Sequence, residues 1–376
     1  AVPDRSSHVT ATPSAVQAST GVATDGTQLF MGPLPYVLAN LPIVDVGIPG
    51  QVEWDPRDPP QPLTQVVAAR AGPSGRAGLR ILYAVLSARA IDRWAPVVLV
   101  RDDRDGSVDY VSPGVTLDSI GTVFGEPSAP LTARAIDPTG TVVMFIQPHA
   151  VVVVDVTSGL TRTAPLPADV DRAGGPIVDG GFTDAGRIIV RTANTAWSVD
   201  SSTLAWAPVA KGAGPEDTRV DTTGGSSRIL AADAEGAPHF VTTVHFPMAL
   251  GWGESVATPE WIATGGVVDE AAVPERFRVP NALFLVSRSD PTVRRALVLG
   301  ANAAGGISGG IRAIGVAGQI VLFQYSVEGR TWVLGVDPTT GLVSRVAEVW
   351  SPVSGVGSPN QVIALSPWAI SHRSMS

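Results

Sequence analysis

Short apolar runs separated by polar turns recur along the chain. Residues 131–163, LTARAIDPTGTVVMFIQPHAVVVVDVTSGLTRT, contain three β-rich runs, with DPTG at residues 137–140 and VTSG at residues 156–159 between them. Asp, Pro and Gly in these positions favour tight turns. Apolar, β-branched runs of this length between turns are typical of strands, so the pattern predicts a β-meander.

The same order of strands and turns returns elsewhere in the chain. TDAG replaces DPTG in the following unit, and DPTTG closes the last unit. The units that share this order lie at residues 64–113, 131–163, 180–209, 218–246, 281–300 and 311–349. Four short strands repeated roughly every 40 to 60 residues are the signature of a β-propeller blade. The expected fold is therefore all-β.

The order "apolar strand, D-x-x-G, apolar strand, V-D-x-x-[TS]-G" resembles the blades of TolB-like, WD-repeat-like and quinoprotein-like propellers. The resemblance covers roughly residues 60–350. The sequence has neither the G-H and W-D dipeptides of WD repeats in register nor the S-x-D-x-G-x-T-W box of sialidases. The resemblance therefore implies a propeller architecture and assigns no subfamily.

Counting the units predicts a single β-propeller of seven blades, with six as the alternative. The seventh blade would combine residues 25–47 with residues 361–370, so that N- and C-terminal strands close the ring and leave no exposed edge. Residues 1–22 are expected to form an extended N-terminal spacer, and residues 23–376 the β-propeller domain.

Composition and charge exclude several classes of protein. With 44% hydrophobic and 16% charged residues, the chain can build a large core. The net charge of −8 argues against nucleic-acid binding, which needs clustered Lys and Arg. The chain has no cysteine, and its apolar runs, such as residues 150–155, are too short for a membrane span. The small, Ser/Thr/Pro-bearing first twenty residues favour a secreted or cell-envelope protein, with a cytoplasmic protein as the alternative.

The stretch RDDRDGSVDY at residues 101–110 is close to a calcium-binding loop. It resembles the hairpin calcium loops of integrin-type propellers, which implies Asp103, Asp105 and Asp109 as metal ligands. Arg101, however, stands at the first ligand position, and calcium takes six to eight oxygen ligands. An acidic hairpin is the favoured alternative, because Asp and Gly suit its turn. The sequence therefore predicts no cofactor, with calcium as the alternative.

Aromatic and acidic residues occur together in the segment GWGESVATPEW. This segment is expected to be part of a long irregular loop over residues 247–280. The predicted ligand-binding residues of this loop are Trp252, Glu254, Glu260 and Trp261. Such side chains could bind a sugar or a protein, and two carboxylates could act as acid and base. His149, at a strand end, could join them at the channel mouth. The alternative is that the tryptophans fill gaps between blades.

These observations lead to two hypotheses of function. The first is a non-catalytic, exported or surface-associated propeller that binds a protein or glycan partner through rim loops. The alternative is a propeller enzyme, a lyase or hydrolase of a carbohydrate or lactone, that uses channel carboxylates and a metal. A component of a virion or another assembly fits the same facts. Enzymes of this fold would gather carboxylates, His or Arg in the channel mouth, whereas binding proteins would spread aromatics over the rim.

Overall fold

The computed structural model of the chain shows short β-strands as the main elements, as the sequence predicts. The residues that the structure describes are 16–17, 19–23, 26–38, 40–41, 44–46, 61–70, 79–85, 93–102, 108–111, 114–118, 122–123, 126–127, 132–211, 213–215, 218–221, 227–232, 238–244, 248–268, 281–299, 311–327, 330–349 and 363–365.

One aspartate organises each of three repeated hairpin turns, which begin at Asp155, Asp200 and Asp337. In each turn the Oδ1 atom of the aspartate accepts the backbone N–H groups of the residues two and three positions later, at 2.7 to 3.4 Å. The residue four positions later has a positive φ: 69° at Gly159, 60° at Leu204 and 71° at Gly341. The turn sequences therefore form the turns that were predicted from them.

Four sheets are separate blades, in which successive strands pair antiparallel. The first contains β11 (Val142–Gln147), β12 (Ala150–Asp155) and β13 (Thr161–Pro165), and the second β14 (Ile177–Phe182), β15 (Ile188–Thr192), β16 (Ala196–Val199) and β17 (Trp206–Pro208). The third contains β18 (Thr218–Asp221), β19 (Ser227–Ala232) and β20 (Pro238–Val244). The fourth contains β21 (Met248–Ala257), β22 (Trp261–Val268), β23 (Asn281–Ser287) and β24 (Arg294–Leu299), extended by β3 (Gln28–Met31) and β2 (Ser19–Val22).

The remaining large sheet has eleven strands. Its central order is β1 (Val16–Gln17), β28 (Leu342–Val349), β27 (Arg330–Val336), β26 (Ile320–Val327), β25 (Ile311–Ala317), β4 (Gln61–Arg70), β5 (Leu79–Val85), β6 (Arg93–Arg101) and β7 (Val108–Val111). Strand β29 (Ile363–Leu365) pairs with β4, and β8 (Leu117–Asp118) with β6; β9 (Thr122–Val123) and β10 (Glu126–Pro127) form a small separate pair.

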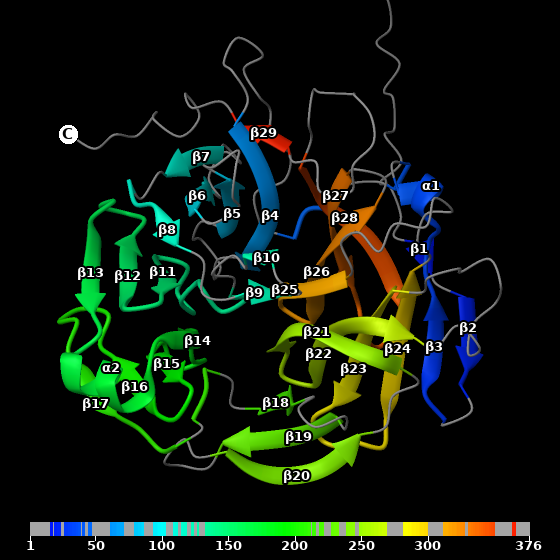
Figure 1. Cartoon of the computed structure of the whole chain (residues 1–376). Helices are drawn as coiled ribbons and strands as arrows, with labels where there is room; N and C mark the ends of the chain where they lie inside the picture. Colours follow the sequence, from blue (N-terminus) through cyan, green and yellow to red (C-terminus); the bar gives the residue numbers. More distant parts are fainter. Residues whose placement is uncertain are drawn as a thin grey trace, which may run out of the picture.

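The sheets are arranged around a common centre and form a single β-propeller (Figure 1). The predictions of seven blades, and of six, are wrong: the described residues form four separate blades and the eleven-stranded sheet. The physical reason is that β25 pairs in parallel with β4, which merges units expected to be separate blades.

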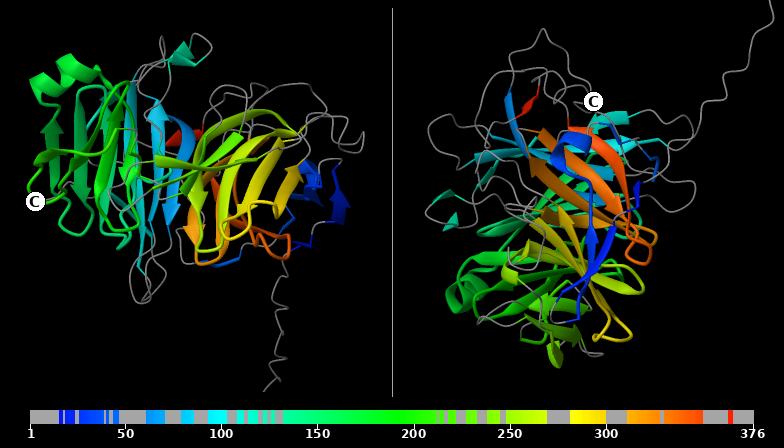
Figure 2. Two further views of the ribbon diagram at one scale, coloured as in Figure 1. Left: turned by 90° about the horizontal axis from the view of Figure 1, so that it is seen from below. Right: turned by 90° about the vertical axis from the view of Figure 1, so that its right-hand side faces the viewer.

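The described strands of residues 25–47 and of residues 361–370, β3 and β29, lie in different sheets, so the predicted terminal blade is not formed. Strand β3 pairs in parallel with β24 and on its other side with β2, the edge strand of that sheet (Figure 2), whereas β29 pairs with β4. The buried side chains of Leu29 and Phe30 explain where β3 lies, since each is only 2% exposed. Strands β1 and β2 lie within residues 1–22, the range expected to form the spacer.

Two short helices, α1 (Pro35–Leu38) and α2 (Ala168–Gly174), complete the described elements. Residues 25–47 are predicted to belong to a terminal blade, and α1 within this range corrects that prediction. No helix in the described ranges combines the length and the apolar character that a membrane span requires.

Strand β12, the middle strand of the first blade, is buried on both faces, which explains its continuous apolar run. In β12, Val152 and Val154 belong to a cluster with Ala68 of β4. Val151 and Val153 point to the opposite face and pack with residues of the next blade, Val190 among them. Burying each valine stabilises the fold by about 1.5–3 kcal/mol, so these interfaces supply much of the stability.

Two glycines allow backbones of different strands to meet without side chains between them. In β25, a Cβ atom added at Gly315 would lie 1.9 Å from the carbonyl oxygen of Ala69 in β4. In β22, a Cβ atom at Gly265 would lie 2.0 Å from the carbonyl oxygen of Ile311 in β25. Strands β22, β25 and β4 can therefore approach one another only because both positions lack a side chain.

We expect Gly315→Ala to lower the free energy of unfolding by about 2–4 kcal/mol, because β4 or β25 must move to accommodate the methyl group. The matched control is Gly318→Ala, in the turn after β25. Gly318 has a φ of 61° and no atom within 4 Å of an added Cβ, so only the left-handed strain remains, about 1–2 kcal/mol. Urea unfolding of both variants measures the difference, and equal losses would contradict the proposed backbone contact.

Candidate functional site

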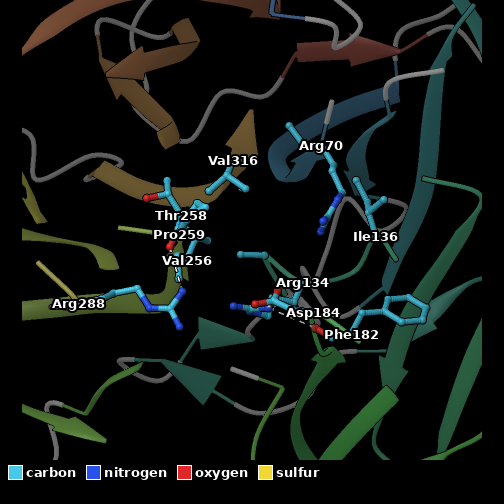
Figure 3. Close-up of a pocket in the computed structure, with 14 residues that line it drawn as sticks. Arg70, Arg134, Ile136, Phe182, Asp184, Val256, Thr258, Pro259, Arg288 and Val316 are labelled. Carbon is cyan, nitrogen blue, oxygen red and sulfur yellow. Dashed lines mark hydrogen bonds and ion pairs between the residues drawn. The ribbon is translucent and has the colours of Figure 1, made fainter. Parts of the chain in front are cut away.

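A cavity of about 390 Å³ lies where residues from three sheets and from the segment before β11 converge. It is bordered by the ends of β4, β14 and β21, by β25, and by the segment that leads into β11 (Figure 3). Its lining residues, which we call the arginine pocket, are Ala69, Arg70, Ala133, Arg134, Ile136, Phe182, Asp184, Val256, Ala257, Thr258, Pro259, Arg288, Gly315 and Val316. The β4–β25 contact thus forms part of its wall.

The charged side chains of the arginine pocket are three arginines and one aspartate, a formal charge of +2. The guanidinium groups of Arg70, Arg134 and Arg288 extend toward the space between them (Figure 3). This positive site contrasts with the net charge of −8 of the whole chain. Clustered guanidinium groups in a partly enclosed site are suited to binding an anion.

Arg134 is held by two acceptors of the second blade and its following turn. Its Nη1 donates to Oδ1 of Asp184 at 2.9 Å and to the carbonyl oxygen of Phe182 at 3.5 Å. The Arg134 side chain is 10% exposed, while that of Asp184 is 51% exposed. The Nε atom of Arg134 is buried and has no hydrogen-bond partner within the described part of the chain. Asp184 therefore compensates only part of the donor capacity of Arg134.

Arg70, at the end of β4, lies opposite this pair. Burial lowers the pKa of Arg70 below its ordinary value, and neighbouring Arg134 adds to the effect, whereas Asp184 and Asp137 act in the opposite direction. A guanidinium nevertheless stays protonated at neutral pH. A partly buried cation that is repelled by a second cation is stabilised when a negative charge is added nearby.

Arg288 lines the side of the pocket formed by the fourth blade. Its Nη1 donates to the carbonyl oxygen of Thr258 at 3.1 Å, and its backbone N–H donates to the carbonyl oxygen of Glu260 at 2.8 Å. The Thr258 hydroxyl accepts the backbone N–H of Trp261 at 3.0 Å. These bonds fix the turn between β21 and β22, so the position of the Arg288 side chain is defined by a well-bonded turn.

The structure places the predicted ligand-binding residues of the fourth blade in different environments. Residues 248–268 form β21 and β22 rather than an irregular loop. Trp261 is 6% exposed, and the guanidinium carbon of Arg295 lies 4.6 Å from its ring centroid. Glu260 is exposed in the adjacent turn. Trp261 thus has the gap-filling position that the alternative prediction described.

Two further predicted residues, Trp252 and Glu254, belong to β21, and their side chains lie outside the described structure. His149 lies in the turn between β11 and β12, with its side chain 66% exposed and its Nδ1 3.4 Å from Oδ1 of Asp171. In Figure 1 this turn and the β21–β22 pair lie in different sheets on different sides of the molecule. The structure therefore does not bring His149 together with Glu260 and Trp261.

The acidic stretch at residues 101–110 connects β6 and β7, which pair as the predicted hairpin. Asp109 lies in β7 opposite Val100, whereas Asp103 and Asp105 lie outside the described residues. Arg101 forms a bidentate ion pair with Asp45, with one Nη2–Oδ2 distance of 2.7 Å. Among the described residues no three His, Asp or Glu side chains are placed to hold a metal. Calcium binding stays a prediction.

The arginine pocket was not predicted from the sequence. A weak signal exists: Ala-Arg occurs at residues 69–70 and 133–134, in each case next to a polar turn. Without the sheet arrangement, nothing distinguishes these arginines from others at strand ends.

No protein-family model and no curated protein sequence matches the chain. Solved structures with a similar fold include the β-propeller domain of the Trilobed protease from Pyrococcus furiosus, with 11% identity, a TM-score of 0.40, and coverage of 77% of this chain and 84% of that chain. The N-terminal domain of Nup159 has 9% identity and a TM-score of 0.40, with 85% and 89% covered. The Pyrococcus horikoshii acylaminoacyl peptidase has 11% identity and a TM-score of 0.40; 79% of this chain and 48% of the peptidase are covered, so the chain spans about half its length. Similarities this distant do not indicate what this chain binds.

We expect Asp184→Asn to lower the free energy of unfolding by about 1–2 kcal/mol, because Arg134 is largely buried and loses a charge-assisted hydrogen bond. Asp169→Asn, at an exposed position in α2, is the control, with an expected change of no more than about 0.5 kcal/mol. Denaturant unfolding of both variants tests this. If the two changes were equal, the Arg134–Asp184 bond would have no special role in stability.

Proposed function

We propose that this propeller is a non-catalytic binding protein that takes an anionic group of its ligand or partner into the arginine pocket. One observation carries the proposal: Arg70, Arg134 and Arg288 extend into a shared cavity whose described lining contains one carboxylate, Asp184. The side chain of Arg134 is only 10% exposed and Arg70 is partly buried next to it. Cations that are partly removed from water are stabilised by a counter-charge, which supports an anion as the ligand of this pocket.

The chemistry of the lining supports an acceptor-rich ligand. Guanidinium groups donate up to five hydrogen bonds and accept none, and their planar geometry matches carboxylate and phosphate oxygens. In a partly enclosed site these bonds are stronger than in water, because fewer water molecules compete with them.

The partner classes expected from the sequence, a protein or a glycan, are compatible with this site when they present an acidic group. The proposed ligand contact lies in the middle of the propeller and not on the rim loops, because Trp261 is buried. Export or attachment to the cell surface stays a prediction, which localisation of the tagged full-length protein in its native host would test.

The enzyme hypothesis has less support from the geometry. Glycoside hydrolysis uses two carboxylates, one as an acid and one as a base or nucleophile. The described lining of the arginine pocket supplies one, Asp184, and its Oδ1 already accepts from Arg134. His149, which is predicted to join the ligand-binding residues at the channel mouth, belongs to a different part of the propeller, with its Nδ1 3.4 Å from Oδ1 of Asp171.

Anion binding should raise the unfolding temperature in a way that depends on Arg70. We expect citrate to stabilise the full-length protein by a few degrees more than sodium chloride of equal ionic strength. Because citrate also stabilises proteins by exclusion from their surface, the informative quantity is the difference between variants. Arg70→Gln should lose the specific part of this shift.

Arg162→Gln is the matched control. Arg162, in β13, donates to the carbonyl oxygens of Ser202 and Ser201 at 2.5 and 2.6 Å and lies outside the arginine pocket. This variant should keep the citrate shift even if it is less stable. Equal citrate shifts in wild type, Arg70→Gln and Arg162→Gln would refute anion binding in the pocket.

Removing Asp184, the only carboxylate in the described lining of the pocket, should strengthen anion binding. Asp184→Asn raises the formal charge of the lining from +2 to +3 and keeps the side-chain shape. Coulomb attraction over a few ångströms then predicts at least about a threefold gain in citrate affinity by titration calorimetry, despite the lower stability of the variant. An unchanged or weaker affinity would show that the anion binds elsewhere.

A further inference from the structure

We infer that the ligand of the arginine pocket is a small amphipathic carboxylate: an organic acid, or the carboxyl end of a chain, with an apolar body next to its charged group. The inference rests on the proposed function and adds the chemical class of the ligand. It follows from the apolar lining, from the size of the cavity and from the kinds of polar group present.

Apolar side chains form much of the wall around the three guanidinium groups. Ile136 and Phe182 lie on one side of the pocket, and Val256 and Val316 on the other (Figure 3). Ile136, Phe182 and Val256 are 2 to 4% exposed, so they are fixed parts of the core. A strongly hydrated inorganic anion would lose water against such walls without gaining contacts. An apolar body attached to the anion would instead bury its surface there.

The size of the cavity excludes large ligands. Its volume of about 390 Å³ lies at the small end of the range for small-molecule pockets, roughly 300–1,000 Å³. An arylalkyl acid fits such a volume, as does the last residue of a peptide. An oligosaccharide would leave most of its sugar rings outside the cavity, and the lining residues could not contact or recognise those rings.

The polar groups of the lining favour a carboxylate over a neutral sugar. Sugar hydroxyls donate as well as accept, so they require acceptors in the site. In the described lining the only carboxylate is Asp184, which bonds Arg134, and Asn, Gln, Tyr and Trp are absent. The described side chains of the lining therefore offer mainly hydrogen-bond donors. Guanidinium groups and carboxylates form paired N–H···O bonds, which an amide of the same shape cannot reproduce.

Titration calorimetry on the full-length protein, with defined probes, tests the ligand class. We expect 3-phenylpropionate to bind at least about tenfold more tightly than acetate, because the phenylethyl group buries apolar surface. We expect 3-phenylpropionamide to bind at least about tenfold more weakly than 3-phenylpropionate, because it lacks the charge.

A variant of the apolar wall tests the contact directly. Val316 is only partly buried, so Val316→Thr keeps the shape of the side chain and should fold. It should weaken 3-phenylpropionate binding several-fold and leave acetate binding unchanged. Val293→Thr is the control, since Val293 is 40% exposed and lies outside the pocket. Equal effects of the two variants on 3-phenylpropionate would overturn the inference.

Peptide probes distinguish the two sources of the carboxylate. Ala-Ala-Phe with a free carboxyl end is compared with its C-terminal amide. Tighter binding of the free peptide than of both its amide and 3-phenylpropionate supports the inference and identifies the end of a partner chain as the ligand. Tighter binding of 3-phenylpropionate than of the free peptide supports it with a free acid as the ligand.

The failures of the two proposals can be told apart. If citrate binds in an Arg70-dependent way but 3-phenylpropionate binds no more tightly than acetate, the amphipathic ligand is refuted and the anion site stands. If neither citrate nor any carboxylate binds, and Arg70→Gln behaves like the wild type, both proposals are refuted.

Discussion

The approach of Gly315 to the carbonyl oxygen of Ala69 is the contact on which both the sheet arrangement and the pocket depend. It joins β25, near the end of the chain, to β4, near its beginning, by a short parallel pairing of Gly315 with Ala69 and Val316 with Arg70. Three of these residues, Ala69, Arg70 and Val316, contribute side chains to the arginine pocket. The backbone contact therefore places a cation and an apolar side chain next to each other.

The local features of this fold could be predicted from the sequence, and the non-local ones could not. An aspartate such as Asp155 bonds the amides of its own turn, so the turn is encoded within a few residues. Strand pairing is different, because periodicity shows that a strand exists and does not identify its partner. The pairings β3–β24, β29–β4 and β4–β25 connect distant segments, and they explain why the predicted blade count and terminal blade failed.

The same distinction applies to the candidate site. Trp261 is predicted to bind a ligand because aromatic and acidic residues occur together in its segment, whereas in the structure it packs in the core next to the guanidinium of Arg295. The pocket arginines, by contrast, are far apart in the chain, and each is unremarkable in its own segment. Arg70 and Arg134 come together only because β4 and the segment before β11 both end at the middle of the propeller. A site assembled from isolated residues leaves little trace in one sequence.

The formal charge of the pocket lining is opposite in sign to the net charge of the whole chain, and this difference affects selectivity between anions. A chain with a net charge of −8 repels anions at long range, and this repulsion is largely screened beyond about 8 Å at physiological ionic strength. Within the pocket the charge is +2, and partial burial weakens the screening. An anion therefore gains little before it makes direct contact with the guanidinium groups. If the pocket binds an anion as proposed, shape and apolar contact with walls such as Phe182 and Val256 would decide which anion is retained, and charge alone would not.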